Sequence, residues 1–166
     1  MATERAREVL SGILTRMGVE TSVEVSEDDE RIVLEVKGPD ASYVIGKKGQ
    51  TLDALQFLVG KIIHRGHEGP FLDEKQAGEG ARESGSKPII VDTEGYRQKH
   101  HDSLVELATK LVGEAVASGK TVAVNPMSPP DRRIIHLTCA KIGGVTTRSE
   151  GEGAFRRLMI IPQRGA

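Results

Sequence analysis

Apolar residues recur three or four positions apart in several segments of the 166-residue chain. From Glu4 to Met17 this spacing predicts an amphipathic helix, and Gly18 is expected to end it. The same spacing predicts a second helix from Gly49 to Ile63, a long helix over residues 94–118 and a further helix over residues 129–141. Each of these helices has an apolar face to bury against another element.

Alternation of apolar and polar residues, the period of a half-buried strand, predicts the β-structure. An acidic turn at residues 26–30 and the glycine-rich turn at residues 150–153 each lie between two alternating segments, so each predicts a hairpin. The two halves of the chain share no internal repeat. We therefore predict an α+β protein of two small domains, residues 1–93 and residues 94–166. The expected strands are residues 19–25, 31–37, 87–92, 121–124, 145–149 and 155–161.

The turn Gly46-Lys47-Lys48-Gly49 follows the apolar pair Val44-Ile45 and leads directly into the second predicted helix. Glycine lacks a Cβ atom, so the backbone can bend sharply at residues 46 and 49 and another backbone can approach closely. The start of the helix offers unpaired N–H groups and the positive end of the helix dipole, which suit a phosphate oxygen. Lys47 and Lys48 add charge at the same place. The turn therefore predicts a grip on a sugar-phosphate backbone.

This turn resembles the Gly-x-x-Gly loop of KH domains. Residues 40–45, after Pro39, predict a short helix capped by Asp40. With it, the elements of residues 1–93 follow the order α-β-β-α-α-β, which is that of the type II KH domain. An ordinary turn between two helices, with solvated lysines, is the alternative interpretation.

Residues 66–87 interrupt this order with five glycines and eight charged side chains. Phe71 and Leu72 are their only sizeable apolar residues. We predict a flexible, solvated insertion before the last strand of the KH domain. A partner-binding loop centred on Pro70, Phe71 and Leu72 is the alternative.

A second candidate site lies in the helix predicted over residues 129–141. Arg132 and His136 are four residues apart, so they share one helical face. An arginine offers a fork of donors to phosphate, and a histidine can donate to phosphate or stack on a base. A surface helix with a satisfied histidine is the alternative.

The passage from Asn125 to Gly151 resembles the R-three-H domain, a single-stranded nucleic-acid-binding module named for its Arg-x-x-x-His signature. The resemblance implies that Arg132 and His136 are the signature pair. On charge grounds we expect phosphate contacts nearby from Arg133, Arg148, Arg156 and Arg157. An ordinary solvated strand remains the alternative for the last two, because alternation sends them to opposite faces.

The net charge of −1 is unevenly distributed along the chain. It is −5 over residues 1–40, +3 over residues 41–65, −3 over residues 66–93 and +4 over residues 94–166. Positive charge thus accompanies both candidate sites. Charge of this modest size predicts a nucleic-acid affinity that is moderate and falls as salt rises.

A KH domain followed directly by an R-three-H domain is the arrangement of the Jag family of bacterial RNA-binding proteins, which this chain resembles over residues 1–65 and 87–162. The match includes Glu94-Gly95-Tyr96-Arg97 at the start of the long helix. The resemblance implies a single-stranded RNA ligand, with single-stranded DNA also possible, and a role in post-transcriptional regulation linked to cell elongation or division. It also implies a heterodimer with a small stand-alone KH protein. Typical members carry a further N-terminal domain, whereas this sequence starts at the KH domain.

Other function classes fit the sequence less well. It contains no Cys-x-x-Cys, no His-Glu-x-x-His and no Walker loop, and adjacent His100 and His101 point in different directions on a helix. We therefore expect no enzymatic activity, no metal and no cofactor. An adaptor that binds a membrane-protein insertase, with the KH fold as a scaffold, is the alternative function.

The amino-acid composition limits the kinds of core, cross-link and binding site that the chain can form. Three Phe, two Tyr and no Trp predict an aliphatic core and exclude a site that depends mainly on aromatic stacking. The single cysteine, Cys139, excludes an internal disulfide and is expected to be a small core residue. No apolar run reaches the length of a membrane span and no signal peptide is recognisable. We expect a soluble, cytoplasmic protein without membrane insertion.

Overall fold

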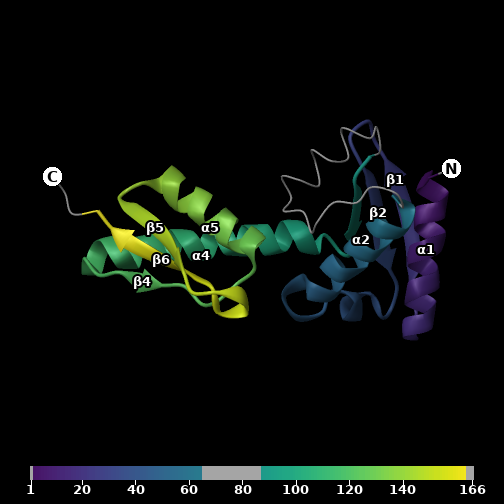
Figure 1. Cartoon of the computed structure of the whole chain (residues 1–166), viewed down its shortest axis with the longest axis horizontal. Helices are drawn as coiled ribbons and strands as arrows, with labels where there is room; N and C mark the ends of the chain where they lie inside the picture. The colour runs from purple at the N-terminus through teal and green to yellow at the C-terminus, as the bar shows by residue number, and fades with distance from the viewer. Residues whose placement is uncertain (1, 65–86, 164–166) are drawn as a thin grey trace. The chain divides into compact units, whose positions relative to one another are not determined.

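A computed structural model describes residues 2–64 and 87–163 of the chain (Figure 1). It divides into two compact units, residues 1–97 and residues 98–166. The division falls inside the first turn of helix α4 (Tyr96–Ser118), because Tyr96 and Arg97 contact the first unit. The domain boundary expected from sequence, between residues 93 and 94, remains a proposal.

The first unit is built on a three-stranded sheet of order β1-β2-β3. Strand β1 (Ser22–Glu27) pairs antiparallel with β2 (Ile32–Lys37), which pairs parallel with β3 (Ile89–Asp92). Alternate residues of β2 are buried, and helices α1 (Ala2–Met17) and α2 (Gln50–Ile63) supply most of the rest of the core. The core is aliphatic, as the composition predicts; its fully buried members include Leu10, Leu14, Leu34, Val36, Leu52 and Val59.

The short helix expected over residues 40–45 is a 3-10 turn, Ala41–Val44, and Asp40 does not cap it. The Asp40 carboxylate instead accepts a hydrogen bond from the backbone N–H of Glu20, 2.7 Å away. This contact joins the turn to the segment that enters β1. The capping prediction was wrong because a distant backbone group competes for the same carboxylate.

The second unit packs helices α4 and α5 (Pro129–Ile142) with a small antiparallel sheet of order β4-β6-β5. The strands are β4 (Val122–Ala123), β5 (Val145–Glu150) and β6 (Arg157–Pro162). The α+β class is thus confirmed. Strand β6 begins two residues later than expected, because residues 153–155 form a 3-10 turn. Cys139 is 1% exposed, and burial raises the pKa of its thiol, so it is the core residue that we predicted.

Helix α4 begins at Tyr96 and not at Glu94. Glu94 and Gly95 both have positive φ, 53° and 64°, which a right-handed helix cannot include. The Asp92 carboxylate accepts the backbone N–H of Thr93 at 2.8 Å and that of Arg97 at 3.3 Å, so it holds the first turn in place.

The flexible insertion and the Phe71–Leu72 loop predicted from sequence lie outside the described residues. Lys87, at the end of that segment, is described, and its Nζ donates to Glu27 Oε1 and to the Asp28 carbonyl oxygen, both at 2.7 Å. None of the helices that the structure describes is long and apolar enough to cross a membrane. Residues 2–64 and 87–163 contain no cluster of His, Cys, Asp or Glu side chains suited to a metal ion.

The packing of α5 in the second unit can be tested at two positions that lie on different faces of the helix. Ile135 is fully buried, whereas Leu137 is 54% exposed. We expect Ile135→Ala to lower the free energy of unfolding by about 3 kcal/mol, through lost apolar burial and the cavity left behind. Leu137→Ala should change it by less than about 1 kcal/mol. Urea unfolding followed by far-UV circular dichroism measures both, and equal losses would contradict the assignment of the two faces.

Candidate nucleic-acid-binding sites

The Gly-x-x-Gly turn has an unusual backbone. Gly46, Lys48 and Gly49 have positive φ values of 69°, 52° and 80°. Left-handed backbone costs a lysine roughly 1 kcal/mol, because its Cβ crowds the following carbonyl oxygen. The conformation leaves the side chains of Lys47 and Lys48 exposed at the tip of the turn, immediately before α2.

Close contacts explain why both ends of the turn are glycine. A Cβ atom on Gly46 would lie 2.1 Å from Thr51 Oγ1. A Cβ atom on Gly49 would lie 2.7 Å from Cε1 of the Tyr96 ring. Any other residue at either position would therefore meet a clash in addition to the backbone penalty.

The amide groups at the start of α2 are less available than we expected. The N–H of Gln50 donates to the Lys47 carbonyl oxygen, and the N–H of Leu52 donates to the Ile45 carbonyl oxygen at 3.4 Å. These two bonds close the turn on itself. Attraction for a phosphate at this turn therefore depends more on Lys47 and Lys48 than on these two backbone N–H groups.

Arg97 joins three parts of the first unit next to this turn. Its Nε donates to the Val91 carbonyl oxygen at 2.9 Å, and its Nη2 donates to Gln56 Oε1 at 3.0 Å. Its Nη1 lies 2.9 Å from Asp53 Oδ1 in the first turn of α2. Asp53 is the one acidic residue between positions 41 and 65, so this pair offsets the negative charge nearest the two lysines.

Tyr96 and Arg97 belong to the segment that carries the family resemblance, but no role for either side chain follows from the sequence pattern. The Tyr96 ring packs against Gly49, and Arg97 donates a hydrogen bond to Asp53. Tyr96 and Arg97 each lie more than 40 positions further along the chain than the residue they contact. Only the run Glu94-Gly95-Tyr96-Arg97 itself signalled that this junction was special. Periodicity could not have found the contacts, because they join segments distant in sequence.

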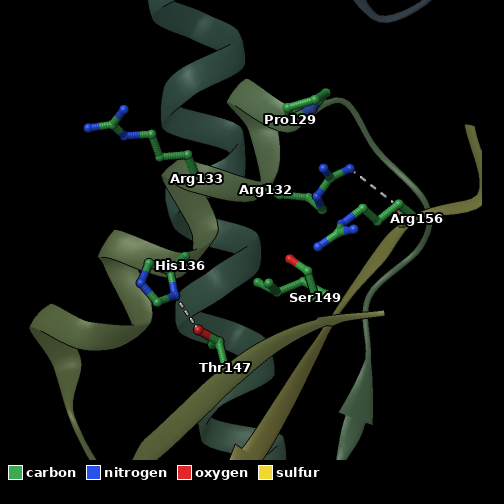
Figure 2. A pocket seen from close by; sticks show the side chains of 8 residues that line it. Pro129, Arg132, Arg133, His136, Thr147, Ser149 and Arg156 are labelled. Atoms are coloured by element: carbon green, nitrogen blue, oxygen red, sulfur yellow. Dashed lines mark hydrogen bonds between the residues drawn. The ribbon is translucent and has the colours of Figure 1, made fainter. Parts of the chain in front are cut away.

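The second site is a pocket of about 510 Å³ between α5 and the β5–β6 hairpin (Figure 2). Helix α5 contributes Arg132, Arg133 and His136, and strand β5 contributes Thr147 and Ser149. The hairpin adds Arg156. Among residues 2–64 and 87–163, no acidic side chain lines the pocket; the residues that line it are Pro129, Arg132, Arg133, His136, Thr147, Ser149, Arg156 and Leu158.

Both signature residues are held by the protein itself. The Nη1 of Arg132 donates to the carbonyl oxygen of Met127 at 2.7 Å and to that of Arg156 at 3.4 Å. The Nδ1 of His136 is hydrogen-bonded to the hydroxyl of Thr147. In Figure 2 the guanidinium groups of Arg132 and Arg156 lie on the same side of α5, while that of Arg133 extends away from them.

Local structure fixes the start of α5. The Ser128 hydroxyl accepts the N–H of Asp131 at 3.3 Å, and two prolines occupy the first helical positions. The Asp131 carboxylate is largely buried and lies 3.0 Å from His100 Nε2. The acidic residue next to Arg132 in sequence is therefore turned towards α4.

The three other arginines predicted to contact phosphate, Arg148, Arg156 and Arg157, do not all line this pocket. Arg156, expected from charge alone, lines the pocket, but Arg148 and Arg157 do not. Arg148 forms an ion pair with Glu150. Arg157 lies opposite Glu150 in the antiparallel register, on the other face of the hairpin from Ser149 and Leu158.

Comparison with known proteins agrees with this arrangement. Residues 3–72 match the KH domain family of KhpA and KhpB, and residues 102–162 match the R-three-H domain family. The two folds and the two sites thus define a tandem KH and R-three-H protein.

Proteins named RNA-binding protein KhpB are similar to this chain along most of its length. The chain is 34% identical over 148 residues to RNA-binding protein KhpB of Clostridium symbiosum, covering 89% of this chain and 60% of that protein. It is 30% identical over 163 residues to KhpB of Bacillus subtilis strain 168, covering 97% and 71%. The KhpB of Lactiplantibacillus plantarum is 26% identical over 151 residues, covering 91% and 42%. The chain belongs to the KhpB, or Jag, family, and it spans about three fifths of the length of the Clostridium symbiosum relative.

The packing of Gly49 against Tyr96 can be tested with a matched glycine. Gly95 also has positive φ, but apart from its two chain neighbours no atom of the described residues lies within 4 Å of the position of its missing Cβ. Gly95→Ala should therefore lower the free energy of unfolding by only about 1 kcal/mol, the left-handed backbone penalty. Gly49→Ala should cost more, roughly 2–3 kcal/mol, because the clash is added to that penalty.

Combining Gly49→Ala with Tyr96→Ala isolates the clash. The double variant should lose less stability than the two single changes added together, because removing the ring relieves the contact. Urea unfolding of the four proteins measures this coupling. Additive losses would show that the ring does not confine residue 49.

Proposed function

We propose that this chain binds single-stranded RNA through two sites, the Gly-x-x-Gly turn and the pocket of Arg132 and His136. The observation that carries the proposal is the pocket itself, where three arginines and a histidine line one cavity and no acidic side chain of the described residues joins them. Such a site attracts a phosphate group and offers it planar forks of donors. The names of the relatives, RNA-binding protein KhpB, support RNA as the ligand.

Each site has a distinct part in the proposed mechanism. The KH groove would hold about four unpaired nucleotides, with Lys47 and Lys48 on the phosphates and the groove against base edges. In the second site Arg132 and Arg156 would hold a phosphate of a neighbouring single-stranded segment. Arg133, which extends away from them (Figure 2), would contact an adjacent phosphate, and His136 would donate or stack. Because one chain carries both sites, binding at one raises the effective concentration at the other.

The wider role is also a proposal. We propose a cytoplasmic protein that acts in post-transcriptional regulation linked to cell elongation or division, without enzymatic activity. A heterodimer with a small stand-alone KH protein is supported by the family match, which covers the KH domains of both KhpA and KhpB. Helix α2 exposes Phe57, Leu58 and Ile62, which suit an apolar contact with such a partner.

Fluorescence anisotropy with labelled single-stranded RNA, single-stranded DNA and duplex RNA at two salt concentrations tests the function. We expect salt-sensitive binding to single strands and weaker binding to the duplex. If the folded protein bound none of the three, the adaptor function would replace the RNA-binding proposal.

Reversing charge at the turn should weaken the first site. Lys47→Asp combined with Lys48→Asp is expected to reduce RNA affinity at least about tenfold, because two phosphate contacts become repulsive. Lys110→Asp combined with Lys120→Asp changes the net charge equally at exposed positions of the second unit that line neither site. Unchanged affinity in the folded Lys47/Lys48 variant, or an equal loss in the control, would contradict a specific role for the turn.

The second site should matter most for longer ligands. Arg132→Ala combined with His136→Ala is expected to weaken binding less than the Lys47/Lys48 change, and mainly on RNA long enough to reach both sites. Because Arg132 also holds Met127, Arg133→Ala with Arg156→Ala provides a second variant that leaves that contact intact. An equal loss on a ligand of about four nucleotides, the length that fills a KH groove, would contradict two separate sites.

A further inference from the structure

Phe155 is the most exposed large apolar side chain in the part of the chain that the structure describes, at 81%. It is also one of only three phenylalanines in the sequence. Single exposed apolar residues are common on protein surfaces. Phe155, however, lies beside Arg156, which lines the pocket of the second site.

The backbone that carries Phe155 is well fixed. Its N–H donates to the Glu152 carbonyl oxygen at 3.2 Å, and the N–H of Arg156 donates to the Gly153 carbonyl oxygen at 3.2 Å. The carbonyl oxygen of Arg156 also accepts the N–H of Met127 at 3.4 Å. The ring is therefore exposed from an ordered turn, and a ligand that covered it would not have to order the backbone first.

Phe155 lines a second cavity, of about 390 Å³, together with Pro126, Glu150, Gly151 and Arg157. Its walls combine the flat faces of an aromatic ring and a proline with a guanidinium donor and a carboxylate acceptor. That combination matches an unpaired nucleobase, which has two π faces and donors and acceptors along its edge. The Glu150 carboxylate can accept from an exocyclic amine, and the Arg157 guanidinium can donate to a ring nitrogen or carbonyl oxygen.

We propose that this second cavity binds one unpaired nucleobase stacked on Phe155, next to the phosphate held by Arg132 and Arg156. This inference rests on the RNA-binding function proposed above and extends its second site by one nucleotide. The two cavities are lined by consecutive residues, Arg156 in the first and Phe155 and Arg157 in the second. The two cavities open on different faces of the β5–β6 hairpin. A ligand that fills both must therefore bend around the turn that joins the two strands. A flexible single strand can do so, whereas a stiff duplex cannot.

The surroundings of Phe155 favour a base over a protein partner. Glu150, Arg156 and Arg157 surround the ring with charge, so it is not part of a continuous apolar patch. One ring can stack with only one base, so stacking here is not the main source of affinity. The ring adds selection for unpaired bases to a site that otherwise recognises phosphate.

The 166-residue sequence contains no tryptophan, so Phe155→Trp places a fluorescent reporter on the proposed platform. The probes are a short single-stranded oligoadenylate and an abasic oligomer of the same length and charge. Oligoadenylate should quench the reporter by stacking, and the abasic oligomer should not. Phe155→Ala should weaken oligoadenylate binding, measured by anisotropy, at least about fivefold and leave the abasic affinity unchanged.

Val116→Ala is the matched control, because Val116 is 54% exposed and lines neither cavity. It should leave both affinities unchanged. Equal quenching by both oligomers, or oligoadenylate binding that survives Phe155→Ala undiminished, would overturn the nucleobase site and leave the RNA-binding function standing. If the wild-type chain bound no oligomer at all, the proposed function and this inference would fall together.

Discussion

The contact between Gly49 and the Tyr96 ring is the constraint on which the first site depends. The turn at residues 46–49 has three residues in left-handed backbone, a conformation that local sequence alone would leave in exchange with others. Tyr96 occupies the space beside Gly49, and Arg97 holds α2 and β3 together next to it. The geometry that exposes Lys47 and Lys48 is therefore determined by residues at the start of α4, which continues into the second unit.

Charge is arranged so that a protein with a net charge of −1 still presents two cationic sites. The acidic residues nearest those sites are engaged elsewhere: Asp53 pairs with Arg97, Asp131 with His100, and Glu150 with Arg148. Two further carboxylates lie at the β1–β2 hairpin, where Glu27 accepts from Lys87 and Asp28 accepts from the backbone N–H groups of Glu30 and Arg31. In the proposed function, affinity would come from these local fields and from the joint action of two sites, and a large overall charge would not be needed.

The sequence predicted most helices and strands because their apolar faces repeat at the period of the element, as in α5 and β2. It failed where a distant group decides the outcome. Asp40 bonds to Glu20 and does not cap the turn beside it, and the start of α4 is delayed by two residues in left-handed backbone. Alternation did predict that the side chains of Arg156 and Arg157 point to different faces, and the two line different cavities. It could not reveal that Arg132 bonds to Met127, since that requires knowing how the loop before α5 folds back.

The two hydrogen bonds that Arg132 donates to backbone carbonyl oxygens help to explain why this residue is an arginine. Both carbonyl oxygens that it contacts, those of Met127 and Arg156, are bonded by Nη1 alone. The planar guanidinium has five donors, so Nε and Nη2 can still meet a phosphate oxygen pair while Nη1 holds the loop. A lysine has one nitrogen and would have to choose between the two tasks. Because the side chain is already half-buried and oriented before any ligand arrives, less rotamer entropy would be lost on binding. Arg132 therefore both fixes the loop at the pocket and is already oriented to bind a phosphate there.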